Sequence, residues 1–270
     1  MNIFIGILLI FALLGLFDKL FGGKLGLAAD SGLESMASLA LSIVGVYCIG
    51  VTAVKSNPEA IAAFAAHLPF DASILIGSLL APDMGGYAIA KEMAATPALG
   101  IFSGVMVASS LGATISFTLP VALTTIRKED TAPFMQGIVW GIVTIPAGVV
   151  AGALLTGLPM GDLIRNLLPI LLLCAGICLC LLKAKDATIR VLSALGNLVR
   201  IASLLLFALV MLGVFLPSYQ IVSDDLFFES LTIVIKIAVV VAGSMVAASL
   251  ILRYFYNAIA RIADRLGINA

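Results

Sequence analysis

Apolar runs long enough to cross a lipid bilayer recur along the whole chain and constrain its fold more than any other feature. A membrane-spanning helix needs about 20 predominantly apolar residues. Of the 270 residues, 62% are hydrophobic and only 11% are charged. A soluble domain with this composition could not cover its apolar surface with polar groups. We therefore predict an all-α, polytopic helical membrane protein, with residues 1–270 forming a single multi-pass transmembrane domain.

Prolines and short polar connections divide the chain into its expected segments. Continuous spans are expected at about 2–17, 36–54, 98–119, 134–158, 167–182, 201–215 and 231–252. We expect a short, weakly amphipathic segment at 58–67 and amphipathic extensions at 191–200 and 254–266. The first run has no basic region before it, so we expect a retained helix rather than a cleaved signal peptide.

The placement of lysine and arginine orients the later connections. Residues 183–200 carry four basic side chains, whereas residues 217–230 carry none but hold three acids. The first connection is therefore expected in the cytoplasm and the second outside. Alternation then puts Arg127, Lys128 and the C-terminus on the cytoplasmic side. Upstream of residue 96 the rule does not decide, because Met1 is cytoplasmic if the segment around residue 83 crosses and external if it re-enters the same face.

One segment interrupts the apolar pattern with a helix breaker, a carboxylate and two glycines. We expect half-helices at 72–80 and 87–95, with a discontinuity at 82–86 that contains Pro82, Asp83 and the two glycines. An ionised side chain at membrane depth costs about 2.5–3.5 kcal/mol even on a lenient scale. Non-helical backbone is tolerated there only inside protein or beside a wet cavity. Because transporters hold their substrates at such broken, charged segments, solute transport is the leading hypothesis.

Asp83 is the main candidate for a substrate-binding residue. We expect it to face an aqueous cavity and to pair with a cationic substrate or a coupling ion. If helix resumes at Asp83, Tyr87 and Lys91 follow on the same face, and Tyr87 supplies a ring face or a hydroxyl. Gly85 and Gly86 let another backbone or a ligand come close. The structural alternative makes Asp83 the N-cap of the second half-helix or an internal partner of Lys91.

Polar and small residues mark the next two spans. Ser110, Thr114 and Thr118 recur every four residues. Such hydroxyls line a polar path or hydrogen-bond to backbone and neighbouring helices, and we take Thr114 and Thr118 as further substrate-binding candidates. In the span after them, glycines at 137, 141, 148 and 152 indicate close helix packing.

No metal site, cofactor or enzyme activity is expected. His67 is the only histidine, and Cys174 and Cys178 lie at helical spacing without a histidine or an acid beside them. The sequence has no phosphate loop, no dinucleotide fingerprint and no HExxH motif, which argues against ATP-driven pumping and hydrolysis. Basic and acidic residues number 15 each, so no basic excess suggests a nucleic-acid partner.

Three stretches resemble the ethanolamine utilisation membrane protein family, the EutH-type ethanolamine permeases. They are residues 81–92 (APDMGGYAIAKE), 112–123 (GATISFTLPVAL) and 141–148 (GIVTIPAG). Their order and spacing also resemble the family's, and Asp18 near the end of the first span fits the same pattern. The resemblance implies a multi-pass permease of the bacterial inner membrane that supplies ethanolamine to a cytoplasmic ammonia-lyase pathway. Ethanolamine is a small amine that is mostly protonated at neutral pH, so an intramembrane carboxylate suits it.

Three hypotheses about function stay open at this point. The first is inward transport of ethanolamine across the lipid bilayer by alternating access, with Asp83 as the counter-charge. The second is transport of another small solute, such as a nucleoside or an ion. The third is an incomplete transporter half, because members of the family continue past the position that matches residue 270 and this chain lacks that C-terminal third. A second subunit or a homo-oligomer would then supply the missing spans.

Overall fold

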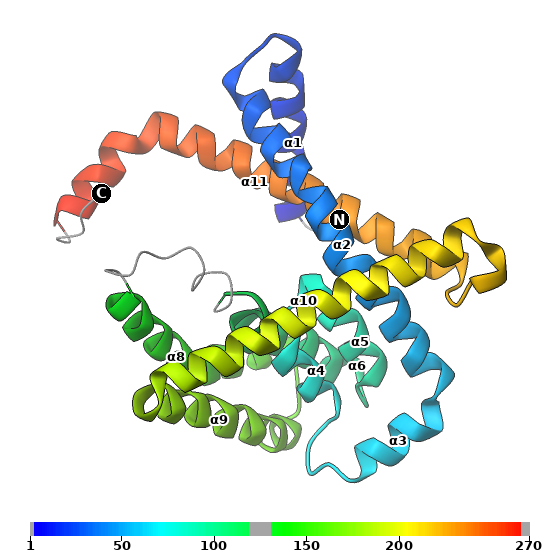
Figure 1. Cartoon of the computed structure of the whole chain (residues 1–270). Helices are drawn as coiled ribbons and strands as arrows, with labels where there is room; N and C mark the ends of the chain where they lie inside the picture. The colour runs from blue at the N-terminus through cyan, green and yellow to red at the C-terminus, as the bar shows by residue number, and fades with distance from the viewer. Residues whose placement is uncertain (1–2, 119–130, 266–270) are drawn as a thin grey trace. The chain divides into compact units, whose positions relative to one another are not determined.

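The computed structural model of the chain describes residues 3–118 and 131–265, which contain helices and no β-strand (Figure 1). The α-helices are α1 (Ile3–Leu20), α2 (Lys24–Ser56), α3 (Pro58–Ala66), α4 (Ser73–Leu79), α5 (Gly86–Met93), α6 (Pro97–Ile101), α8 (Thr131–Thr156), α9 (Met160–Lys183), α10 (Lys185–Phe215) and α11 (Asp224–Arg265). Short 3-10 helices are η1 (Pro82–Met84) and η5 (Pro217–Tyr219), and π-helices are η2 (Phe102–Gly112) and η3 (Thr114–Thr118).

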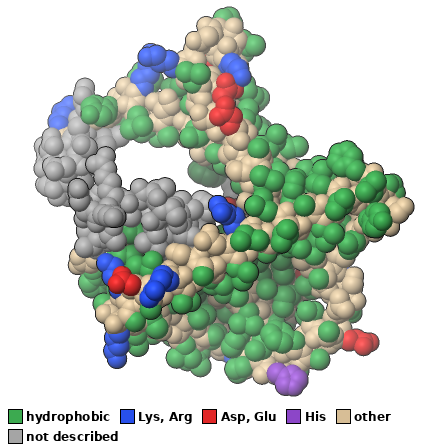
Figure 2. Space-filling view, viewed as in Figure 1, with side chains coloured by type: hydrophobic (Ala, Val, Ile, Leu, Met, Phe, Trp, Pro, Cys, Tyr) green, Lys and Arg blue, Asp and Glu red, His purple; other side chains and the backbone are tan. Residues whose placement is uncertain are grey.

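Within the described ranges, six helices are long and apolar enough to span a bilayer by length and composition. They are α1, α2, α8, α9, α10 and α11. Hydrophobic side chains cover most of the visible face in Figure 2, whereas charged side chains gather in a few places. The predicted class of all-α, polytopic helical membrane protein is therefore confirmed.

Several helices are longer than the spans expected from hydropathy. Helix α2 begins at Lys24 rather than near residue 36, and α9 begins at Met160 rather than near residue 167. Polar side chains such as Glu34 lower hydropathy without breaking a helix, and no proline lies between residues 24 and 56. The extension expected at 191–200 is continuous with α10. Arg127 and Lys128 lie outside the described residues.

The chain divides into two compact units, residues 1–40 with 228–270, and residues 41–227. In the first unit, glycines allow close helix contact. A Cβ at Gly32 of α2 would overlap the backbone of Ala242 in α11, and a Cβ at Gly243 would overlap the backbone of Leu8 in α1. These positions tolerate only glycine at the observed spacing.

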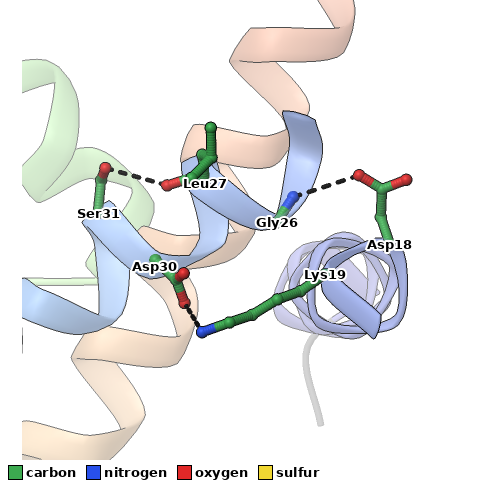
Figure 3. A network of polar contacts seen from close by, with 6 residues as sticks. All are labelled: Asp18, Lys19, Gly26, Leu27, Asp30 and Ser31. Atoms are coloured by element: carbon green, nitrogen blue, oxygen red, sulfur yellow. Dashed lines mark hydrogen bonds and ion pairs between the residues drawn. The ribbon is translucent and has the colours of Figure 1, made fainter. Parts of the chain in front are cut away.

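Asp18 and Lys19 hold the corner between α1 and α2 through polar contacts, of which Figure 3 shows those with Gly26 and Asp30. The Asp18 carboxylate accepts hydrogen bonds from the backbone N–H groups of Leu25 (2.9 Å) and Gly26 (3.3 Å). Lys19 Nζ lies 2.6 Å from Asp30 Oδ1. Asp18 thus satisfies N–H groups in the first turn of α2 that have no partner within the helix, which is a structural role.

The hydrophobic core of the second unit is built from α4, η2, α8 and α9. Fully buried side chains from these helices pack together at Ile74, Phe102, Leu111, Ile142 and Ile170. Helix α4 packs closely on η2, and η2 packs on α8. Because α4 belongs to this core through Ile74, the first half of the broken segment is fixed within the unit.

Candidate functional site

The predicted interruption at residues 82–86 is confirmed. Pro82 has no N–H and restricts the residue before it to extended backbone. Helix α4 accordingly ends at Leu79, and Leu80 (ψ 134°) and Ala81 (ψ 154°) are extended. After η1, Gly85 takes φ +83° and α5 begins. An L-residue at this φ is disfavoured by about 1–2 kcal/mol, so glycine is required here.

The turn between the half-helices is closed by a single carbonyl group. The Ala81 oxygen accepts hydrogen bonds from Met84 N (3.0 Å) and Gly86 N (3.1 Å). A Cβ at Gly86 would lie 2.6 Å from the Leu80 oxygen and 2.7 Å from the Ala81 oxygen. The space beside Gly86 is therefore filled by the protein backbone.

The two half-helices form a hairpin whose ends meet at Asp71. This residue precedes α4, and its Oδ2 accepts a hydrogen bond from the backbone N–H of Ala95, just after α5 (3.0 Å). Its Oδ1 accepts from the N–H (3.0 Å) and the hydroxyl of Ser73. The Asp71 N–H in turn donates to Asn166 Oδ1 (2.7 Å). Since the hairpin starts and finishes at the same place, this geometry favours the re-entrant alternative over a crossing.

Glycines of α6 and η2 allow close packing, on one side, of α5 and of the break between the two half-helices. A Cβ at Gly104 would lie 3.0 Å from the Tyr87 Cα, and a Cβ at Gly112 would lie 2.5 Å from the Leu80 oxygen. The backbone of η2 therefore runs directly against the hairpin, and Gly112 lies at the level of the break.

Helix α2 encloses the turn on another side. A Cβ at Gly85 would lie 3.0 Å from Val46 Cγ1 and 3.2 Å from Tyr47 N, and Gly50 leaves room for the side chain of Ile89. The structure thus shows close approach of protein backbone at both Gly85 and Gly86, and contact of these glycines with a ligand stays a prediction.

Asp83 lies in η1 at the tip of the hairpin and is exposed. No cation among the described residues lies within ion-pair distance of its carboxylate; the ion pairs in that part of the chain are Lys19–Asp30 and Lys55–Glu92. The N-cap of α5 is Gly85, without a side-chain hydrogen bond. Both structural alternatives for Asp83, an N-cap and an internal partner of Lys91, are therefore wrong.

The expected stripe of Asp83, Tyr87 and Lys91 is also interrupted. Helix does not resume at Asp83, because Gly85 reverses the backbone and α5 starts at Gly86. Tyr87 and Lys91 remain one turn apart on α5, and both are exposed. The structure thus keeps two members of the stripe on one helical face and puts Asp83 in the turn before it.

The hydroxyl groups of the following span bond to their own helix. Ser110 Oγ donates to the Met106 carbonyl (2.7 Å), and Thr114 Oγ1 donates to the Ser110 carbonyl (2.7 Å). Thr114 is close in sequence to Gly112, so it lies near the level of the break, whereas Thr118 is exposed at the end of η3. The hydroxyl oxygens of Ser110 and Thr114 keep acceptor capacity, but their O–H donors are used.

Two features of this site were missed by sequence reasoning. Asp71 lies only two residues before α4, and a single acid beside Ser73 gives no sign that it also binds Ala95, 24 residues away. The π-helical backbone of η2 extends over 11 residues, although π-helix is mostly confined to single turns and is frequent at functional sites. Nothing in the composition of residues 102–112 distinguishes π-helix from α-helix.

The glycines of α8 do not all make the expected close contacts. A Cβ at Gly152 would lie 2.6 Å from Met106 Sδ, but Cβ atoms at Gly137, Gly141 and Gly148 would meet no described atom within 4 Å. Close packing of α8 within the described chain is therefore limited to its C-terminal part.

A cavity of about 740 Å³ opens where the ends of the hairpin meet. Its lining comes from the C-terminal ends of α2 and α5, the start of α9, helix α3 and the segments beside α4 and α6. With a re-entrant hairpin, alternation of the spans puts all of these ends at one face of the membrane.

The fold and this segment define a polytopic helical membrane protein with a helical hairpin that carries an exposed acid at its tip. The chain belongs to the family described as ethanolamine utilisation protein, EutH, whose model matches residues 1–270. It is 34% identical to a protein of Listeria monocytogenes named "Probable ethanolamine permease EutH", over 99% of this chain and 72% of the relative.

Two further relatives match over smaller shares. "Uncharacterized protein YxeR" of Bacillus subtilis is 37% identical over 74% of this chain and 54% of its own length. "Probable ethanolamine permease EutH" of Salmonella typhimurium is 38% identical over 53% of this chain and 35% of its own length. The chain thus spans only part of the length of these relatives. No solved structure matches it.

Proposed function

We propose that the chain transports ethanolamine, or a similar small amine, across the bacterial inner membrane by alternating access, with Asp83 as the counter-charge for the ammonium group. The observation that carries the proposal is the exposed Asp83 carboxylate, which has no ion-pair partner among the described residues. The names of the Listeria and Salmonella relatives support the choice of substrate.

The magnitudes favour a cationic ligand. Holding a charge at membrane depth costs about 2.5–3.5 kcal/mol. An ammonium group 4 Å away gains about 4 kcal/mol at the effective dielectric constant of a protein surface. A bound amine therefore recovers part of the cost of the carboxylate, since its ammonium group must also be desolvated, whereas a neutral or anionic solute recovers none.

The length of the hairpin sets how deep in the membrane the Asp83 site lies. Helix α4 has seven residues, and at 1.5 Å per residue it extends about 10 Å. If α4 begins at the edge of the hydrocarbon core, which is about 30 Å thick, Asp83 lies about a third of the way across. Tyr87, Thr114 and Thr118 are proposed to line the path beside it, while Gly85 and Gly86 form the turn.

A re-entrant hairpin would also decide the orientation of the N-terminus, which the basic residues upstream of residue 96 leave open. The N-terminal end of α1 is then external, and the connection with Lys19 and Lys24 falls on the cytoplasmic side, in keeping with the preference of basic residues for that side. The same alternation leaves residues 183–200 and the C-terminal end of α11 cytoplasmic.

The test is uptake of labelled ethanolamine into liposomes that contain the purified protein. Wild-type protein should accelerate uptake over empty liposomes, Asp83→Asn should abolish the acceleration, and Asp225→Asn should not, because Asp225 is an exposed acid at the start of α11. Unchanged uptake in Asp83→Asn would overturn the assignment. Competition by nucleosides or by inorganic cations would favour the second hypothesis, and uptake only after a second protein is added would favour the third.

A further inference from the structure

The cavity at the ends of the hairpin has room for a ligand and for water. Its volume is about 740 Å³, and a water molecule occupies about 30 Å³ of liquid. Asp71 and Ala72 line it before α4, and Met93 and Ala95 line it at the end of α5. A solute in this cavity therefore contacts both ends of the segment that carries Asp83, about 10 Å from the tip along α4.

Carboxylates outnumber cationic groups in the lining. The acids are Asp71, Glu92 and Asp162, and the bases are Lys55 and Arg165. Clefts with an excess of one sign of charge concentrate ions of the opposite sign. The cavity thus favours cations over anions.

Two of the three carboxylates already have partners. Asp71 accepts hydrogen bonds from Ser73 and Ala95, and Glu92 Oε1 lies 3.5 Å from Lys55 Nζ. The half-buried Asp162 carboxylate has neither an ion pair nor a hydrogen bond within the portion of the chain described. Its position in the first turn of α9 also suits the helix dipole, which is the structural alternative for this residue.

We infer that this cavity is a second binding site, a vestibule where the Asp162 carboxylate captures small ammonium ions before they reach Asp83. The inference deepens the proposed function and takes its substrate class from it. Arg165 lowers the affinity of the cavity for ammonium ions, because its guanidinium group lines the same cavity and repels cations. Its Nε donates to the Pro69 carbonyl (2.5 Å), so it is fixed beside the cavity rather than folded over Asp162.

Opposite effects of two neutralising substitutions test the vestibule in uptake assays. An exposed or half-exposed ion pair contributes about 0.2–1 kcal/mol, which corresponds to a change of about 1.4- to 5-fold. Asp162→Asn should raise the half-saturating ethanolamine concentration by this factor, and Arg165→Gln, which keeps an N–H donor for Pro69, should lower it. Maximal rates should stay unchanged. Glu59→Gln is the matched control, because Glu59 is an exposed acid on α3 outside the lining.

A second measurement does not depend on transport. Ala62 lines the cavity and Ala63, its exposed neighbour on α3, does not. In a Cys180→Ser background, since the other three cysteines are buried, Ala62→Cys should react faster with a trimethylammonium thiosulfonate than with a sulfonate reagent. Ethanolamine should slow this reaction, and Ala63→Cys should show neither effect. Asp162→Asn should lower the ratio of the two rates about 2- to 30-fold, because the loss of the carboxylate slows the cationic reagent and speeds the anionic one by about 1.4- to 5-fold each.

The outcomes separate the two proposals. Ethanolamine protection of Ala62→Cys without any uptake would support the vestibule and refute transport. Normal uptake that Asp83→Asn abolishes, combined with equal reagent rates and no protection at position 62, would refute the vestibule alone. A decrease in affinity for both Asp162→Asn and Arg165→Gln would mean that these residues only support local structure.

Discussion

The Asp71 carboxylate should determine whether the hairpin stays closed. In Asp71→Asn one carbonyl oxygen remains, and it is expected to keep the Ser73 contacts, because these lie adjacent in sequence. The amide NH₂ group would then face the Ala95 N–H. Because both groups are donors, the hydrogen bond that the carboxylate accepts from Ala95 would be lost. A hydrogen bond to a charged group contributes about 1.5–3 kcal/mol, and we expect about 1–3 kcal/mol for this one, which joins the half-buried Asp71 side chain to the exposed Ala95.

Two assays should register this loss. The Ala95 amide should exchange its hydrogen about 5- to 150-fold faster, since 1.4 kcal/mol is a factor of ten. The midpoint of thermal unfolding in detergent should fall by roughly 2–12 °C, at 2–4 °C per kcal/mol. Glu34→Gln is the control, because Glu34 is an exposed acid within α2 with no ion pair among the described residues. Unchanged exchange at Ala95 in Asp71→Asn would refute the hairpin closure.

Three further predictions test the turn at Gly85, the N-terminal cap of α2 and the packing of α2 on α10. Gly85→Ala should destabilise by about 1–2 kcal/mol, because φ is +83°; unfolding in detergent measures this, and an unchanged midpoint would contradict the turn geometry. Asp18→Ala should cost about 1 kcal/mol, because the N-terminal N–H groups of α2 lose their acceptor; exchange at Leu25 should increase, and protection equal to wild type would refute the cap. Gly45→Val should lower the midpoint more than Gly137→Val, because a Cβ at Gly45 would overlap the backbone of Phe207 and one at Gly137 meets nothing described; equal midpoints would argue against close contact of α2 and α10.

The break in the helix was predictable because its causes are local. Pro82 removes a donor and Gly85 supplies a positive φ, and both are visible in the sequence. The direction of the second half-helix was not, because it depends on the contact of Asp71 with Ala95 across 24 residues. The spacing also predicted Asp83 and Tyr87 on the same helical face. This was wrong, because a periodicity argument assumes a continuous helix and the turn at Gly85 interrupts it.

The hydroxyl stripe illustrates a different limit of sequence reasoning. Its spacing was read correctly, but the same spacing lets Thr114 donate to the Ser110 carbonyl one turn earlier. Whether such a group faces a path or its own backbone depends on its rotamer, which the sequence does not specify. Asp83 as a substrate-binding residue stays a prediction for the same reason, because its partner would be the solute.

The central claim is that the carboxylate at the hairpin tip is reached by water and by a small amine. Tyr87→Cys in the Cys180→Ser background, which keeps the Asp83 carboxylate and puts a thiol at an exposed position of the proposed path, tests it most directly, with a membrane-impermeant thiol reagent and with a lipid-soluble one. We expect the thiol to react with the impermeant reagent, and we expect ethanolamine to slow this reaction. Reaction with the lipid-soluble reagent alone, or labelling that ethanolamine leaves unchanged, would contradict it.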